Sequence, residues 1–193
     1  MRYFIYGGSG SGKSAFAERL VSGFPEPNER CYIATMCPEG DEARLRIARH
    51  RAARADRGFT TIERYTALAE LPLPDRPIVL LECLGNLVAN EMFSPGGAGK
   101  DARRAVLTGL ASLHRRAEHF ILVSNDVGSD GVIYDGATRA YQEVMAAINA
   151  ESAAASDVFV EMVCGIPLYR RAGSTRGGVR APRLISLAPR GDC

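Results

Sequence analysis

Short apolar runs alternate with longer amphipathic stretches along most of the chain. The apolar runs predict strands at 2–6, 31–34, 59–63, 78–82, 120–124 and 157–163. The stretches between them have a helical period and predict helices at 13–22, 41–56, 101–118 and 136–153. Runs such as 78–81 and 120–123 are apolar throughout, which is typical of strands buried on both faces. The pattern therefore predicts an α/β fold, a mainly parallel sheet with helices on both faces.

The length and the C-terminal composition predict the domain organisation. With 193 residues and 46% hydrophobic content, the chain suits one domain, which we place at residues 1–171. Beyond Pro167 the periodic pattern ends, and 172–193 form a tail rich in Arg, Gly and Pro. Because the tail has no aromatic residue for stacking on bases, we interpret it as a solvated end and leave an RNA-binding arm as the alternative.

Charge narrows the class of partner. The chain has 24 basic and 22 acidic residues, a net charge of +2, which favours a small anion over nucleic acid as the partner. The five cysteines form no C-x-x-C pair, so reduced thiols explain them better than disulfides or zinc. We find no apolar stretch long enough to cross a membrane and no signal-peptide pattern, and we predict a cytoplasmic protein.

One motif carries most of the chemical information. Residues 7–14 read GGSGSGKS, a complete G-x-x-x-x-G-K-[ST] phosphate loop between a predicted strand and a predicted helix. Glycines allow successive N–H groups to face one point, and the helix start adds positive potential. The chain has two lysines, Lys13 and Lys100, against 22 arginines, so we expect Lys13 to reach the outer phosphates and Ser14 to bind Mg²⁺. The predicted nucleotide-binding residues of this P-loop NTPase-like domain are Gly7, Gly8, Ser9, Gly10, Ser11, Gly12, Lys13 and Ser14.

Polar residues follow three other predicted strands. Ligands of parallel sheets bind at the carboxyl ends of the strands, where the chain places Thr35, Glu82 and Asn125–Asp126. We expect Glu82 to bind Mg²⁺ or its water shell; an ordinary strand-end carboxylate is the alternative. Asp126 has either a functional role or a role in a turn.

The predicted helix at 41–57 has two contrasting faces. Leu45, Ala48, Ala52 and Ala55 form an apolar stripe that we expect to pack, and the opposite stripe holds Arg46, His50, Arg54 and Arg57. Positive neighbours disfavour imidazolium, so His50 is a candidate nucleophile beside arginines that attract phosphate. A solvated surface histidine is the alternative interpretation.

Beyond the phosphate loop, a series of further motifs follows along the chain: 32–35 (YIAT), 41–42, 46–50 (RIARH), 59–63, 80–84 (LLECL), 123–128 (VSNDVG), Asn149 and 165–168 (GIPL). Together with the loop, these ordered motifs resemble those of one family, the bifunctional adenosylcobinamide kinase and adenosylcobinamide-phosphate guanylyltransferase of cobalamin synthesis. The chain departs from the family pattern at Gly10, where many relatives have Arg, at Gly85, where Thr is common, and at Ala150, where Gln is common.

The resemblance implies a two-step enzyme assembled as a homotrimer. The first step phosphorylates the hydroxyl of adenosylcobinamide from ATP or GTP, and the second attaches GMP from GTP, giving adenosylcobinamide-GDP. The second step would proceed through a GMP-histidine intermediate at His50. The nucleotide site implied by the resemblance also includes Ala34, Thr35, Met36, Arg51, Ala52, Ala53, Arg54, Glu63 and Glu82.

Two other functions stay open on the sequence. A generic P-loop small-molecule kinase would transfer phosphoryl groups with His50 as a bystander. A GTP-binding module that has lost catalysis would bind nucleotide without turnover, consistent with the departures at Gly10 and Gly85.

Overall fold

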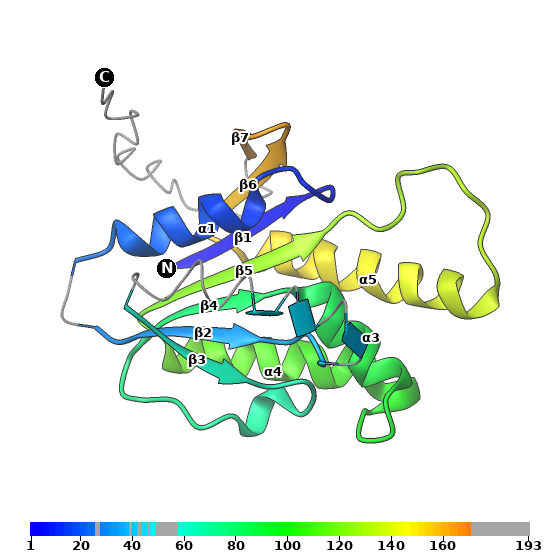
Figure 1. Cartoon of the computed structure of the whole chain (residues 1–193), viewed down its shortest axis with the longest axis horizontal. Coiled ribbons are helices and arrows are strands. Elements are labelled where there is room, and N and C mark those ends of the chain that lie inside the picture. Colours follow the sequence, from blue (N-terminus) through cyan, green and yellow to red (C-terminus); the bar gives the residue numbers. More distant parts are fainter. Residues whose placement is uncertain (26–27, 39, 42–43, 46, 49–57, 171–193) are drawn as a thin grey trace.

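A seven-stranded sheet organises the protein (Figure 1). The computed structural model describes residues 1–25, 28–38, 40–41, 44–45, 47–48 and 58–170. The strands are β1 (Arg2–Gly7), β2 (Arg30–Ala34), β3 (Phe59–Glu63), β4 (Ile78–Glu82), β5 (His119–Asn125), β6 (Val158–Val163) and β7 (Ile166–Arg170), in the order β3-β2-β4-β5-β1-β6-β7. All neighbouring pairs are parallel except β6–β7, so the predicted, mainly parallel sheet is confirmed.

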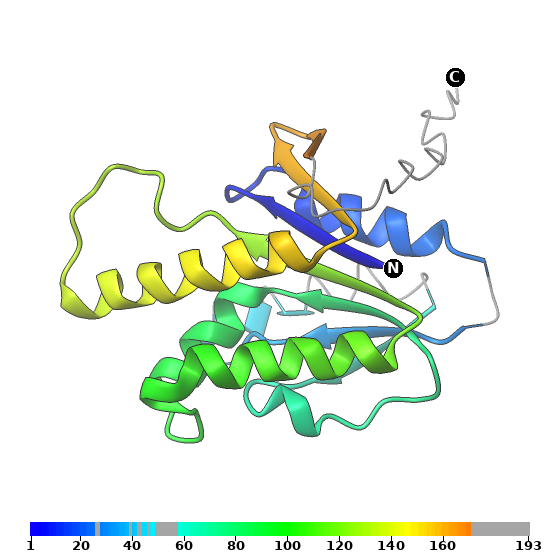
Figure 2. The same cartoon turned by 180° about the vertical axis from the view of Figure 1, so that it is seen from behind.

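Helices cover both faces of the sheet, as predicted (Figures 1 and 2). One face carries α1 (Lys13–Ser22), and the other carries α3 (Leu84–Phe93), α4 (Ala102–Arg116) and α5 (Gly136–Ala155). There are two 3₁₀ turns. The first, η2 (Leu68–Glu70), lies between β3 and β4, and the second, η3 (Gly99–Asp101), lies between α3 and α4. The layers form a three-layer α/β sandwich.

Alternating side chains of each central strand divide the core into two layers. In β4, Leu80 packs in the layer beneath α1, and Leu81 packs in the layer beneath α3, α4 and α5. In β1, Ile5 and Phe4 are divided in the same way. Because successive residues of a strand point to opposite faces, a strand covered on both sides has to be apolar throughout.

Two elements differ from the sequence prediction. Helix α3 was missed: Gly85 and Asn86 in its first turn have low helix propensity, and burial of Leu84, Leu87 and Val88 stabilises the helix instead. Strand β7 was also missed, because the chain was expected to lose regular structure beyond Pro167. It pairs antiparallel with β6 at the edge of the sheet, where a proline is tolerated.

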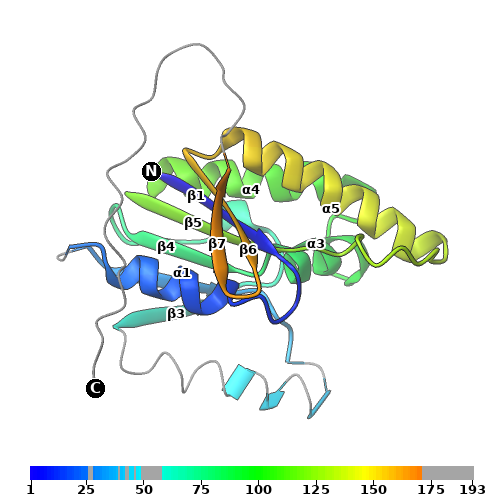
Figure 3. The ribbon, with the colours of Figure 1, turned by 90° about the horizontal axis from the view of Figure 1, so that it is seen from above.

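The predicted helix at 41–56 is described only in part. Positions 40–41, 44–45 and 47–48 are helical, and they lie apart from the sheet layers (Figure 3). Leu45 is 64% exposed and Ala48 is exposed, so the prediction that these two residues pack is wrong for the described chain. Ala52, Ala55 and the predicted tail at 172–193 lie outside the described residues.

Among the described residues, no helix combines the length and the apolar character needed to cross a membrane.

Candidate nucleotide site at the carboxyl edge of the sheet

The loop between β1 and α1 depends on glycine at two positions. Gly7 approaches β6 so closely that a Cβ there would lie 2.5 Å from the carbonyl oxygen of Met162. Gly12, the N-cap residue of α1, has φ of 87°, a conformation that side chains disfavour. None of the described side chains caps this helix start, and its first turn holds no acidic residue. The free N–H groups and the helix dipole therefore favour an anion at the loop.

Neighbouring groups hold the loop in place. The N–H of Gly165, in the β6–β7 turn, donates to the carbonyl oxygen of Ser11 at 3.1 Å. The Ser11 hydroxyl is buried without a hydrogen-bond partner among the described residues. Buried hydroxyls are usually paired, so this one can still form a hydrogen bond with a ligand bound at the loop.

Lys13 lies inside the loop and not on the surface. Its residue is 7% exposed, and its Nζ donates to the carbonyl oxygen of Gly8 at 2.6 Å. Burial lowers the pKa of Lys13, while the nearby Cys83, Glu82 and Asp126 oppose that shift. A buried ammonium beside a helix start gives the loop a positive charge where a phosphate would sit.

The predicted Mg²⁺ residues come together from distant parts of the chain. Ser14 is in α1 and Glu82 ends β4, and β1 and β4 are separated in the sheet by β5. The Ser14 hydroxyl nevertheless donates a hydrogen bond to Oε1 of Glu82. The Tyr32 hydroxyl, from β2, donates to Oε2 at 3.0 Å. Hydroxyl and carboxylate oxygens are suitable ligands for Mg²⁺, so these two residues fit the ion.

Three other predicted nucleotide residues lie at the ends of β2 and β3. Ala34 lies between Glu63 and Glu82 in the register of β3, β2 and β4. Glu63 is exposed at this edge and accepts a hydrogen bond from the Tyr65 hydroxyl at 2.8 Å. Met36 follows Thr35 and is partly buried. The structure thus places Ala34, Glu63 and Glu82 side by side at this edge of the sheet.

The side chain of Thr35 was expected to contribute to the nucleotide site, but in the structure it bonds to the protein backbone. It is fully buried; its Oγ1 donates to the carbonyl oxygen of Cys83 at 2.7 Å and accepts from the Cys83 N–H at 2.9 Å. The Asn90 side chain, from α3, donates to the carbonyl oxygens of Thr35 and Tyr65 at 2.8 and 3.1 Å. Asn90 therefore ties together the ends of β2 and β3, and sequence reasoning missed it because it missed α3.

Asn125 and Asp126 also reach the loop. Asn125 lies opposite Gly7 in the β1–β5 pairing, and the N–H of Asp126 donates to the carbonyl oxygen of Gly7 at 3.0 Å. The side-chain hydrogen bond from Ser129 holds the pKa of Asp126 below its usual range. Burial, followed by the charge of Asp126, raises the pKa of Tyr6 to about 12. Asp126 thus caps a turn and places a negative charge near the loop.

Five predicted site residues lie outside the described residues: His50, Arg51, Ala52, Ala53 and Arg54. Tyr32, in contrast, stood in a matching motif without an assigned role, and its contact with Glu82 gives it one. Taken together, the described groups can hold a polyphosphate and a divalent cation at one edge of the sheet.

Known proteins are similar to this chain over most of its length. Residues 3–169 match the family model described as cobinamide kinase / cobinamide phosphate guanyltransferase. The chain is 32% identical to the bifunctional adenosylcobalamin biosynthesis protein CobU of Escherichia coli (strain K12), with 86% of this chain and 97% of that protein covered. It is 31% identical to the bifunctional adenosylcobalamin biosynthesis protein CobP of Pseudomonas aeruginosa, with 87% and 96% covered.

Among solved structures, flagellar accessory protein FlaH from Methanocaldococcus jannaschii aligns with a TM-score of 0.44 at 12% identity, covering 83% of this chain and 70% of that one.

Proposed function

The chain belongs to the cobinamide kinase / cobinamide phosphate guanyltransferase family, and we propose that its single phosphate loop serves both transfer reactions. The protein is an enzyme of adenosylcobalamin biosynthesis with nucleotide and cobinamide substrates. One observation carries the proposal: Lys13, Ser14 and Glu82 meet at the carboxyl edge of the sheet. This is the arrangement that phosphoryl transfer requires, a positioned cation beside a metal site.

In the proposed kinase step, the loop positions the triphosphate for attack by the acceptor. The acceptor hydroxyl oxygen forms a bond to the γ-phosphorus, the bond to the β–γ bridging oxygen breaks, and the hydroxyl proton passes to solvent water. Lys13 and the N–H groups at the start of α1 stabilise the charge that moves onto the leaving diphosphate. ATP or GTP serves as the donor.

Ser14 and Glu82 are the residues that would hold Mg²⁺ in this site. The ion, when bound, withdraws charge from the phosphate oxygens. Tyr32 supports this function because its hydrogen bond fixes one carboxylate oxygen of Glu82 and leaves the other toward Ser14.

In the proposed second step, His50 is the nucleophile. A ring nitrogen attacks the α-phosphorus of GTP, and pyrophosphate leaves; the phosphate of the acceptor then attacks the same phosphorus, and the imidazole leaves. Ala34, Thr35, Met36, Glu63 and the segment Arg51–Arg54 hold the guanine nucleotide in this proposal. A covalent intermediate allows the two bulky substrates to react one after the other.

Labelling with α-labelled GTP tests the proposal. We expect acid-labile, alkali-stable label on the protein, located at residue 50 by peptide mapping. His50→Ala should abolish the label, and His114→Ala, on α4, is the matched control. Phosphoryl transfer to adenosylcobinamide without protein-bound label would favour the generic kinase, and GTP binding without any turnover would favour the lapsed module.

The assembly and location in this proposal follow the resemblance. A homotrimer is expected, and sedimentation equilibrium of the purified protein at several concentrations measures its mass directly. A stable monomer would contradict the trimer without affecting the labelling result. The cytoplasm, which supplies nucleoside triphosphates, is the proposed location.

A further inference from the structure

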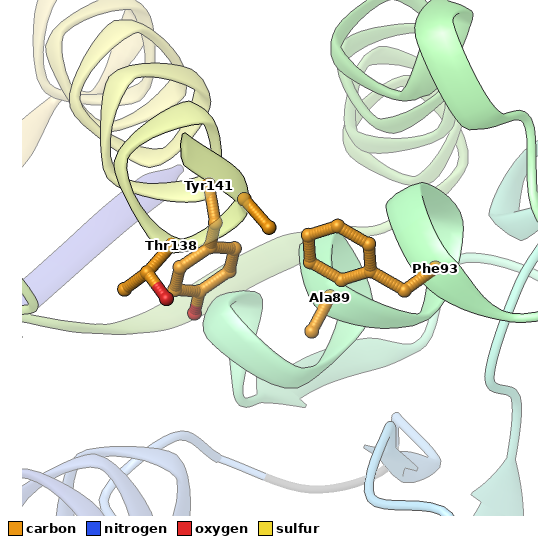
Figure 4. A pocket seen from close by; sticks show the side chains of 5 residues that line it. Ala89, Phe93, Thr138 and Tyr141 are labelled. Carbon is orange, nitrogen blue, oxygen red and sulfur yellow. The ribbon is translucent and has the colours of Figure 1, made fainter. Parts of the chain in front are cut away.

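A groove between α3 and α5 lies outside the nucleotide site, and none of the nucleotide-site residues lines it. It has a volume of about 310 Å³ and is lined by Ala89 and Phe93 of α3 and by Ala137, Thr138 and Tyr141 of α5. Figure 4 shows Phe93 and Ala89 on one wall and Tyr141 and Thr138 on the other. Phe93 is 57% exposed, so an aromatic ring borders the opening. The lining is apolar and aromatic, as in sites that bind organic ligands.

The inner wall of this groove reaches the carboxyl edge of the sheet. The Tyr141 hydroxyl donates to the carbonyl oxygen of Gly85 at 3.2 Å. A Cβ on Gly85 would lie 3.0 Å from that hydroxyl and 3.6 Å from Nδ2 of Asn125. Asn125 in turn lies opposite Gly7, where the phosphate loop begins. Residues at the inner wall of the groove therefore contact the nucleotide edge of the sheet, one strand away from the loop.

The other flank of the phosphate loop is filled by protein. The Gly165 N–H contacts the Ser11 carbonyl oxygen at 3.1 Å, and a Cβ on Gly12 would lie 3.5 Å from the Cα of Gly165. The β6–β7 turn thus packs directly on the loop. We therefore infer that the acceptor approaches the γ-phosphate from the side of α3 and α5.

We propose that the groove between α3 and α5 is the docking site of the corrinoid acceptor. This inference rests on the proposed function, because it assigns the second substrate of the same site. The groove is too small for a whole corrin macrocycle, and it holds one methyl-rich edge of the ring between Phe93 and Tyr141. The hydroxyl-bearing arm extends past Gly85 to the phosphate loop. Apolar ring edges gain most from contact with aromatic and methyl groups.

Tyr141 is a positioning residue in this arrangement. Burial raises the pKa of Tyr141 to about 12, so its phenol keeps the proton that it donates to Gly85. That hydrogen bond connects α5 to the first turn of α3 and fixes the width of the inner end of the groove. Removal of the hydroxyl should therefore change acceptor binding more than nucleotide binding.

Filling the groove tests the proposal. Ala89→Trp places an indole in the groove, and Ala154→Trp, an exposed alanine at the far end of α5, is the matched control. We expect Ala89→Trp to raise KM for adenosylcobinamide about tenfold or more, in line with the loss of shape complementarity in a pocket. GMP labelling of the protein by GTP, which needs no acceptor, should stay at the wild-type level. The control should leave both values unchanged.

Phe93→Ala is the second variant, chosen because a largely exposed side chain can be truncated without loss of folding. It should weaken equilibrium binding of adenosylcobinamide, followed by the visible absorbance of the corrin during dialysis. Unchanged acceptor KM in Ala89→Trp, or loss of GMP labelling in step with acceptor binding, would overturn the docking site. Wild-type protein that never modifies adenosylcobinamide would instead overturn the proposed function, so the two failures are distinguishable.

Discussion

The phosphate loop and the groove between α3 and α5 lie along the same edge of the sheet but differ in chemistry. At the loop, a lysine that is 7% exposed donates to the loop backbone, and Glu82 accepts hydrogen bonds from Ser14 and Tyr32. In the groove, a phenylalanine that is 57% exposed faces a tyrosine across an open space. The loop buries charge before a ligand arrives, whereas the groove leaves apolar surface for a ligand to cover.

This difference explains how one edge of the sheet could bind both a charged nucleotide and a largely apolar acceptor. Preorganised charge recognises a polyphosphate and lowers the barrier to transfer, but it costs stability because a buried ammonium loses hydration. Exposed apolar side chains cost the free protein little stability. They contribute to binding only when a ligand removes them from water. Substitutions in the loop should therefore affect catalysis strongly, and substitutions in the groove should affect acceptor affinity more mildly.

The largest effect is expected for Lys13→Ala. Loss of the ammonium should lower kcat/KM of the kinase step about 100- to 1,000-fold, the range for removal of a group that stabilises transition-state charge. Lys100→Ala, the other lysine and an exposed one, is the control and should match the wild type. Steady-state kinetics measure both; a drop of less than threefold in Lys13→Ala would remove the loop from the catalytic machinery.

A smaller loss is expected for Glu82→Gln. The amide keeps the shape of the side chain but weakens its interaction with Mg²⁺. We expect activity to fall about 10- to 100-fold at limiting Mg²⁺, the range seen when a residue that supports a bound metal is replaced. Excess Mg²⁺ should restore part of the activity. Glu70→Gln, at an exposed carboxylate, controls for charge. Activity with an unchanged Mg²⁺ requirement would assign Glu82 a purely structural role.

The stability cost of the loop should appear in Lys13→Met. Burial lowers the pKa of Lys13 below 10.5, so between the lowered pKa and 10.5 the unfolded chain binds more protons than the folded chain. The free energy of unfolding contributed by this group therefore rises with pH through that window, and kinase activity, which needs the charged form, falls.

At neutral pH, Lys13→Met should raise the free energy of unfolding by roughly 0.5–2 kcal/mol, as for other stabilising changes at active sites. It should also remove this pH dependence. Urea unfolding between pH 7 and pH 10 measures both properties. A variant less stable than the wild type at pH 7 would show that the hydrogen bond from Nζ to Gly8 outweighs the cost of burial.

The mildest effect is expected at the inner end of the groove. In Gly85→Ala the new methyl group would approach the Tyr141 hydroxyl to 3.0 Å, and we expect KM for adenosylcobinamide to rise about three- to tenfold. Adding Tyr141→Phe should relieve the contact and recover part of the loss. Gly96→Ala, where a Cβ meets nothing within 4 Å, is the control. Equal KM values for all four proteins would separate the groove from acceptor binding.

Much of the fold was predictable because its signals are local. The strand at 78–82 was predicted with the bounds of β4, and the helix at 13–22 with those of α1. Helix α3 was not predictable in this way, since its first turn contains Gly85 and Asn86 and its stability comes from packing on the core. Strand β7 likewise depends on its partner β6, and no periodic pattern marks it.

The sequence by itself determined the phosphate loop, because glycine conformations and a helix start are properties of eight consecutive residues. Only the tertiary structure decided which distant groups meet that loop. Ser14 and Glu82 are 68 residues apart, Tyr32 and Glu82 are 50 apart, and Gly85 and Tyr141 are 56 apart. Strand order and helix packing bring these pairs together, and neither is encoded in the residues that make the contact.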